Sequence, residues 1–276
     1  MAEGSARLDH LQILSDAPDR LAAFYRDALA MTAERLDRRR WLCAAPDRRV
    51  LIAPGAPRTL GFAAFRAGSE AIRERLDRHG QTLGPSPTPL FDGEAFSVTD
   101  PDGNTLVFGH AARGRRPPGA GPALDGRLQH VVFASDDPER LLAFYTRVVG
   151  AALSDKVLQN GALLACWLRT DREHHTLAVF RSRTPGQRLD HHSYEVRDWG
   201  LIRDWADHFA RRGITLEWGP GRHGPGNNLF IMVRDPDGNL VELSAELEII
   251  SGDRPVGIWA HEDRTFNMWG AAPLRT

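Results

Sequence analysis

Three side chains in the second half of the chain have the chemistry of a metal site: His130, His191 and Glu242. Each lies in a short stretch that predicts a β-strand. Two histidines and one carboxylate on three strands around one cleft form the facial triad of non-haem Fe(II), which leaves coordination positions open. A carboxylate in the apolar run 240–243 is also costly to bury without a partner. A lone histidine on a strand is usually structural, so the predicted site depends on all three residues together.

His192 is the alternative to His191 as the second ligand, because the two are neighbours in the chain. Side chains of consecutive strand residues point to opposite faces of a sheet, so only one of the two can face the cleft. The sequence match described next favours His191, and His192 stays the alternative.

The chain contains an internal duplication. Residues 8–25, LDHLQILSDAPDRLAAFY, match residues 128–145, LQHVVFASDDPERLLAFY, without a gap. Further along, DPDGNTLVF from Asp100 matches DPDGNLVEL from Asp235. A repeat on this scale predicts two similar structural modules.

The boundaries of these modules follow from composition. Residues 113–126 are rich in Gly, Pro and Arg without an apolar period, which predicts a linker. We therefore expect a metal-free module at 1–112, a catalytic module at 127–250 and a tail at 251–276.

The first copy acts as an internal control for the metal site. It keeps His10 at the place of the first ligand, but has Phe62 (LGF against LDH) and Val107 at the places of the other two. Residues needed only for the fold should match between copies, whereas ligands should differ if one copy has no site. We therefore expect a single metal ion, bound by the second copy.

Periodicity predicts the same order of elements in each copy. In the first copy we expect Asp16 and Ser69 to cap two helices, and the second helix to end near Gly80. The expected strands and hairpins lie at 8–14, 41–45, 50–53, 59–65, 94–99 and 104–109, and in the second copy strands lie at 128–134, 151–158, 162–169, 175–181 and 188–196, with helices at 137–149 and 198–212.

The overall composition is that of a globular protein. A formal net charge of −1 gives no reason to expect nucleic acid as a partner. No apolar run approaches the length of about 20 residues that spans a bilayer, so we expect no membrane contact. Cys43 and Cys166 form no CxxC pair, which agrees with a reducing, cytoplasmic location.

Longer motifs resemble one family. HHTLAVF from His174, RLDHHSYEV from Arg188 and GRHGPGNNLFIMVRDPDGNLVE from Gly221 resemble the second module of type I extradiol catechol dioxygenases, in the vicinal oxygen chelate superfamily. The resemblance covers nearly the whole chain. It implies an α+β fold of duplicated modules, each with two βαβββ units curling into an open barrel, and a first module that has lost its metal.

Site roles also follow from this resemblance. It implies that His130, His191 and Glu242 bind Fe(II), with Mn(II) as the alternative ion, and that the substrates are a catechol-type molecule and O2. His175 matches the family's acid–base histidine, and His223 matches a histidine that hydrogen-bonds the substrate. A solvent-facing histidine at a strand edge and a loop histidine without a role are the respective alternatives.

One position departs from the family pattern. Met232 stands where the family usually has a tyrosine, nine residues after the histidine of the GRHG loop. Alternation places Met232 and Phe230 on one face of a strand, so we expect both to contact the substrate. An adaptable thioether there suggests a bulkier or less polar ring. The alternative is that Met232 only fills core space.

Two further points stay open in the sequence. The aromatic-rich segment 257–270 either covers the cleft or packs as an ordinary tail, and we favour the ordinary tail. The first module completes the structure, and we expect a homo-oligomer. Other functions on this scaffold are a metal-dependent isomerase or transferase, whose ligands are usually split between modules, and a binding protein without catalysis.

Overall fold

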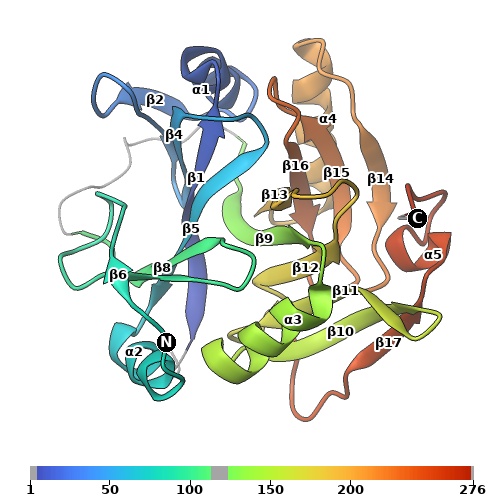
Figure 1. Ribbon diagram of the computed structural model, residues 1–276. Coiled ribbons are helices and arrows are strands. Elements are labelled where there is room, and N and C mark those ends of the chain that lie inside the picture. The colour runs from blue at the N-terminus through green and yellow to red at the C-terminus, as the bar shows by residue number, and fades with distance from the viewer. Residues whose placement is uncertain (1–4, 113–123, 275–276) are drawn as a thin grey trace.

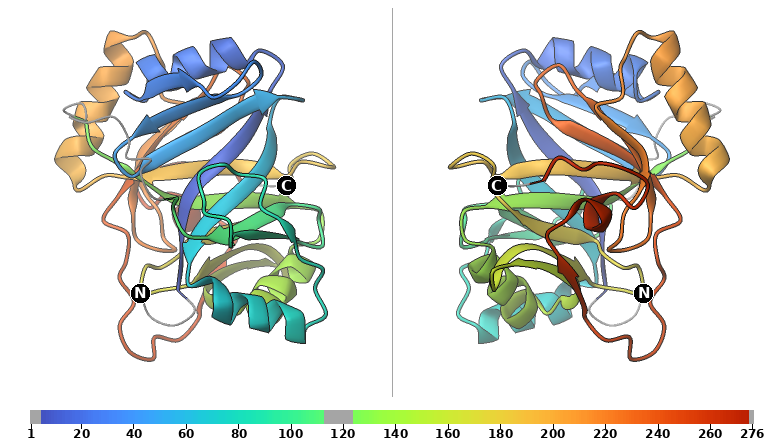
Figure 2. Two further views of the ribbon diagram at one scale, coloured as in Figure 1. Left: turned by 90° about the vertical axis from the view of Figure 1, so that its left-hand side faces the viewer. Right: turned by 90° about the vertical axis from the view of Figure 1, so that its right-hand side faces the viewer.

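The computed structural model describes residues 5–112 and 124–274, so most of the predicted linker lies outside the described residues. Two sheets lie side by side, the blue-to-green first module next to the green-to-red second module (Figure 1). α1 and α4 lie together at one end of the paired sheets, α2 and α3 lie at the other end, and the C-terminal segment with α5 runs over the second module (Figure 2).

The first sheet has eight strands in the order β2-β3-β4-β1-β5-β8-β7-β6. It consists of two βαβββ units that meet where β1 pairs with β5 in antiparallel fashion. The elements are β1(Ala6–Ser15), α1(Pro18–Asp27), β2(Thr32–Arg35), β3(Trp41–Ala45) and β4(Arg48–Pro54), then β5(Thr59–Ala67), α2(Ser69–Arg78), β6(Gly84–Pro85), β7(Phe96–Thr99) and β8(Thr105–Gly109).

The second module repeats this plan, and the tail adds a ninth strand, giving the order β14-β15-β16-β13-β9-β12-β11-β10-β17. The predicted fold class is therefore confirmed. The elements are β9(Arg127–Ser135), α3(Pro138–Ala143), η1(Phe144–Val149), β10(Ala152–Gln159), β11(Ala162–Arg169) and β12(Leu177–Arg181), then β13(Leu189–Glu195), α4(Trp199–Arg211), β14(Trp218–Arg222), β15(Leu229–Arg234), β16(Leu240–Ala245), β17(Gly257–Ala260) and α5(Asp263–Phe266).

The predicted helix caps in the first copy are wrong by one residue. Ala17 is the N-cap of α1 and Gly68 that of α2, and neither makes a side-chain cap bond. The Asp16 carboxylate lies one residue before the cap and 3.9 Å from the Arg20 guanidinium instead. In the second copy Asp137 does cap α3, accepting the Arg140 backbone N–H at 3.1 Å.

Strand pairing confirms the alignment of the two copies. On β1, the residue two positions after His10 pairs with Phe62 of β5. On β9, the residue two positions after His130 pairs with His191 of β13. In the same way, the β5 residue that pairs with His10 pairs on its other side with Val107 of β8. The β13 residue that pairs with His130 pairs on its other side with Glu242 of β16. The three compared positions are thus equivalent in space.

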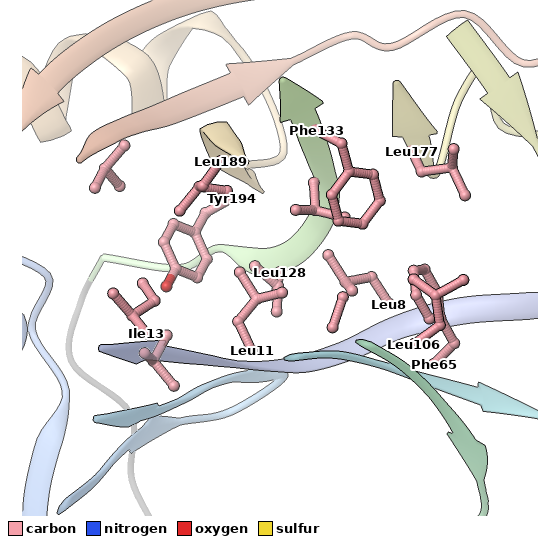
Figure 3. Close-up of a cluster of buried hydrophobic side chains, with 14 of the residues drawn as sticks. Leu8, Leu11, Ile13, Phe65, Leu106, Leu128, Phe133, Leu177, Leu189 and Tyr194 are labelled. Atoms are coloured by element: carbon pink, nitrogen blue, oxygen red, sulfur yellow. The ribbon is translucent and has the colours of Figure 1, made fainter. Parts of the chain in front are cut away.

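The two modules share one apolar core between their sheets (Figure 3). Reciprocal polar contacts join their edges: Arg20 of α1 reaches Asp237 at 2.8 Å, and Arg140 of α3 pairs with Asp102. The labelled core residues come from both modules: Leu8, Leu11, Ile13, Phe65, Leu106, Leu128, Phe133, Leu177, Leu189 and Tyr194.

Candidate metal centre and active site

The three predicted ligands converge from adjacent strands of the second sheet, β9, β13 and β16. Nε2 of His130 lies 3.2 Å from Oε2 of Glu242, and Nε2 of His191 lies 3.3 Å from the same oxygen. All three side chains are buried. They form the one group of this kind among the described residues, a 2-His-1-carboxylate metal site.

The outer nitrogens of the two histidines identify their tautomers. Nδ1 of His130 lies 2.5 Å from Oε1 of Gln129, whose amide nitrogen donates to the His175 carbonyl at 2.6 Å. Nδ1 of His191 lies 2.8 Å from Oδ1 of Asp190. Both Nδ1 atoms therefore carry protons, and in the neutral rings a bare Nε2 faces the carboxylate.

The unprotonated Nε2 atoms of His130 and His191 and the carboxylate oxygen of Glu242 all carry lone pairs. These atoms repel one another unless a positive charge lies between them. Burial by itself raises the pKa of Glu242, but contacts with His130, His191 and His223 hold that pKa well below its usual range. Burial lowers the pKa of His191, but Asp190 and Glu242 outweigh burial and raise it to about 9. A divalent cation fits this donor set and would replace the proton on His191.

His192 points to the opposite face, as alternation predicts. Its Nε2 lies 3.2 Å from the Tyr25 hydroxyl of the first module. Burial first, and then the charges of His191 and His130, lower the pKa of His192 to about 3. His192 is therefore a neutral core residue outside the ligand group.

The equivalent place in the first module is filled with apolar side chains. The rings of Phe62 and Phe91 meet the His10 ring edge-on, with centroids 5.8 and 4.9 Å away. His10 uses both ring nitrogens, toward Asp9 and Thr88, each at 2.7 Å. The residues that fill this place are Leu51, Phe62, Ala64, Leu90, Phe91, Ala95 and Val107.

A cavity of about 480 Å³ opens over the ligands of the second module. His175 lies on its wall, and its ring centroid is 4.4 Å from that of His130. Burial, and then the nearby His130 and His174, lower the pKa of His175 well below its usual range. A neutral imidazole thus stands beside the metal site.

His223 lies on the same wall and is held on both sides. Its ring stacks on Phe230 at a centroid distance of 3.9 Å and an interplanar angle of 1°. Its Nδ1 donates to the Phe266 carbonyl at 2.5 Å, and its Nε2 lies 3.6 Å from Oε1 of Glu242. Phe230 lies beneath His223, whereas Met232 lines the cavity beside its cross-strand partner Glu242.

The C-terminal tail also forms part of the cavity wall, so the preference for an ordinary packing tail is wrong. Thr265, Phe266 and the segment 271–273 line the cavity. The backbone N–H of Gly224, next to His223, donates to the Thr265 carbonyl at 2.9 Å. The tail and the GRHG loop therefore support each other.

Several residues of the site were not predicted. Gln129 and Asp190 orient the ligand histidines, and Asn228 donates to Glu242 at 3.3 Å. Arg58 reaches the cavity from the first module. The first two had a signal in the sequence, since each directly precedes a ligand histidine, as Asp9 precedes His10.

Comparisons with known proteins agree with this site. The family model of the glyoxalase/bleomycin resistance protein/dioxygenase superfamily matches residues 127–243. Metapyrocatechase 2 of Cupriavidus necator is 30% identical over 234 residues, covering 76% of this chain and 71% of the relative. Biphenyl-2,3-diol 1,2-dioxygenase of Paraburkholderia xenovorans is 28% identical over 264 residues, covering 87% and 83%.

Solved structures share the fold. Homoprotocatechuate 2,3-dioxygenase of Brevibacterium fuscum superposes with a TM-score of 0.83 at 20% identity, over 98% of this chain and 90% of that chain. The Mn(II)-bound glyoxalase of Novosphingobium aromaticivorans superposes with a TM-score of 0.80 at 23% identity, over 97% and 91%.

Fold and site together define a duplicated metalloenzyme of this superfamily with one 2-His-1-carboxylate centre. The chain belongs to the type I extradiol catechol dioxygenases. Within the described residues, none of the helices combines the length and apolar character needed to cross a membrane.

Proposed function

We propose that the chain opens the ring of a catechol-type aromatic diol beside its two hydroxyls, with O2, at a single Fe(II) on His130, His191 and Glu242. The observation that carries this proposal is the convergence of three buried ligand atoms in one module, with a cavity directly above them. An isomerase or transferase with ligands split between modules is disfavoured, because Phe62 and Val107 are apolar and buried.

Fe(II) suits the donor set of two imidazoles and one carboxylate on one face, which leaves room for substrate and O2. When bound, the ion supplies Lewis acidity toward the diol and a site where O2 can be reduced. A 25% identical relative from Rhodococcus jostii is an iron-dependent extradiol dioxygenase, and the glyoxalase above holds Mn(II). We propose Fe(II) as the bound ion, with Mn(II) as the alternative.

His175 is proposed as the acid–base residue. It is neutral because burial lowers its pKa, and its ring lies against that of His130 at the cavity wall. A neutral imidazole there can accept a proton from a substrate hydroxyl and return it later in the reaction. In the first step the O–H bond breaks, an N–H bond forms on His175, and the substrate oxygen becomes anionic.

His223 is proposed to hydrogen-bond the same substrate. Since Nδ1 donates to the Phe266 carbonyl, Nε2 is left as an acceptor that points toward the site. Phe230 acts on the substrate only through His223, by fixing the plane of that ring. We therefore assign substrate contact to His223 and Met232, and support of the His223 ring to Phe230.

The substrate is proposed to carry an apolar substituent. The cavity that Met232 lines is also walled by Trp167, Phe180, Leu189, Trp218 and Phe266. Aromatic and aliphatic walls favour a ligand whose substituent is itself apolar.

We propose that 1–112 is a metal-free module that supports the catalytic module at 127–250, that 251–276 is a tail whose described residues cover the cavity, and that the enzyme is a cytoplasmic homo-oligomer. Analytical ultracentrifugation tests the last point, and a single monomeric species would contradict it.

The function is tested by anaerobic loading with Fe(II) or Mn(II), followed by O2 uptake and ultraviolet detection of ring-opened product with catechol and with 2,3-dihydroxybiphenyl. We expect about one metal ion per chain, stoichiometric O2 uptake and faster turnover of the apolar diol. Metal binding without O2 uptake on either diol would contradict the proposed reaction.

A further inference from the structure

The cavity-wall residue His175 is connected to a buried carboxylate on β10 that the proposed chemistry does not use. Asp155 is completely buried, and Oδ2 of Asp155 lies 3.2 Å from Nε2 of His174. Nδ1 of His174 in turn lies 3.0 Å from Nδ1 of His175. The first is a close contact of opposite polarity rather than a hydrogen bond, and the second joins two ring nitrogens. Together they form a chain of contacts that connects the carboxylate with the cavity wall.

The C-terminal tail fixes the outer end of this chain. The Asp155 carboxylate accepts hydrogen bonds from Nη1 of Arg254 at 2.8 Å, the Gly257 backbone N–H at 3.1 Å and Nε1 of Trp259 at 2.8 Å. A carboxylate that is held by several donors stays ionised and fixed in orientation. Asp155 therefore only accepts protons in its contacts. This fixes which atom is donor and which is acceptor in the contacts of His174 and His175.

The direction of each proton in the chain follows from the Asp155 carboxylate. Nε2 of His174 faces a carboxylate, so it carries the ring proton of His174. When His174 carries this one proton, its Nδ1 is an acceptor, and the proton in its contact with His175 comes from Nδ1 of His175. That leaves Nε2 of His175 without a proton, as a base needs.

We propose that Asp155 and His174 are positioning residues that lock His175 in the Nδ1–H tautomer and direct its bare Nε2 into the cavity. The inference rests on the proposed role of His175. When Nε2 gains the proton of a substrate hydroxyl, the new imidazolium is stabilised through His174 by the Asp155 carboxylate. Outer partners that orient an active-site histidine typically change activity about 10–100-fold.

The first test uses two substitutions at one position. His174→Phe keeps a ring but removes both nitrogens, whereas His174→Gln keeps a donor for Asp155 and an acceptor for His175. We expect His174→Phe to lower kcat about 10–100-fold with KM for catechol and metal content little changed, and His174→Gln to recover most of the loss. Equal kcat in both variants would overturn the proposal.

A matched control lies in the first module, where Asp9 is also a buried carboxylate beside a buried histidine. Asp9→Asn should lower thermal stability about as much as Asp155→Asn, but only Asp155→Asn should lower kcat. If both variants lose kcat in proportion to stability, Asp155 is merely structural and the proposal is wrong.

A spectroscopic test needs no substitution. In Zn(II)-loaded protein labelled with ¹⁵N-histidine, we expect NMR to show the His175 proton on Nδ1 and the His174 proton on Nε2. A proton on Nε2 of His175 would contradict the locked tautomer. The proposed function fails separately: it is wrong if His175→Ala keeps full turnover, whereas loss in His175→Ala without loss in His174→Phe refutes only the positioning chain.

Discussion

Each module begins with an equivalent strand that carries a histidine, but the two modules neutralise a buried carboxylate with different groups. In the first, Asp9 beside His10 is neutralised by Arg49 and Arg66, each with a guanidinium nitrogen 2.5 Å from the carboxylate. In the second, the buried carboxylate is Glu242, and the groups around it are histidines.

This difference shows how little separates a binding site from a packed core on one scaffold. Phe62 and Val107 fill the space that the site occupies in the other copy, and they leave His10 fully bonded to protein groups. In the second module the two Nε2 atoms face the Glu242 carboxylate instead, and a positive charge, from a metal ion or from a proton on His191, offsets the cost of burying these groups.

The largest expected effect comes from giving the second module the residues of the first, His191→Phe with Glu242→Val. We expect complete loss of metal and turnover with the fold retained, because the first module buries the same residues at equivalent positions. Metal analysis and circular dichroism measure the two outcomes.

The matched controls are His10→Ala and His192→Ala, which alter buried histidines outside the ligand group. Both should keep about one metal ion per chain. Loss of the metal in His10→Ala would contradict the single-site interpretation, and loss in His192→Ala would reassign the second ligand.

The next effect in size concerns chemistry without loss of metal. His175→Ala should retain the ion and lower kcat about 10²–10⁴-fold, the usual contribution of a positioned acid–base group. His223→Ala should cost less, about 1–3 kcal/mol, because one hydrogen bond to the substrate is lost. Steady-state O2 uptake with matched metal content checks both, and an undiminished rate in His175→Ala would rule out its role.

The third effect concerns the folding stability that the Asp9 carboxylate contributes in the first module. Asp9→Asn should destabilise the fold by about 3 kcal/mol, since one partner of a buried ion pair is removed. Burial raises the pKa of Asp9. This effect is outweighed by His10, Arg49 and Arg66, which together lower the Asp9 pKa from 3.8 to about 2. A folded-state pKa below the unfolded one stabilises the protein above 3.8, and this is lost as pH falls toward 2.

Asp9→Asn should therefore flatten the acid side of the Tm-against-pH curve. Differential scanning calorimetry of both proteins measures this. A variant curve parallel to the wild-type curve through the acid range would mean that Asp9 does not carry that part of the pH dependence.

The smallest effect is expected at the position where the chain departs from its family. Met232→Tyr should place a hydroxyl in the cavity, improving small catechols and hindering larger ones by about tenfold in relative kcat/KM, near 1.4 kcal/mol. Met232 lines the cavity and pairs across the strands with Glu242, which supports the geometry. Identical ratios for a small and a bulky catechol in both proteins would place Met232 outside substrate contact.

The module plan and the ligand triad could be predicted from the sequence alone. A duplication aligns equivalent strands, so the contrast of Phe62 with His191 and of Val107 with Glu242 is visible without coordinates. Strand alternation also separated His191 from His192, because side-chain direction in a strand is a local property. Short edge strands such as β2(Thr32–Arg35) and β14(Trp218–Arg222) were not predicted, since polar or Gly-rich segments give no periodic signal.

The residues behind and above the site could not be predicted, because tertiary packing brings them there. The contact of Asp155 with His174, the tail residues on the cavity wall and the reach of Arg58 into the second module all join residues far apart in the chain. Phe230 shares a strand face with Met232, yet it lies under His223 because the GRHG loop folds over it. No local pattern encodes such contacts, because they depend on how loops and the tail pack once both sheets have formed.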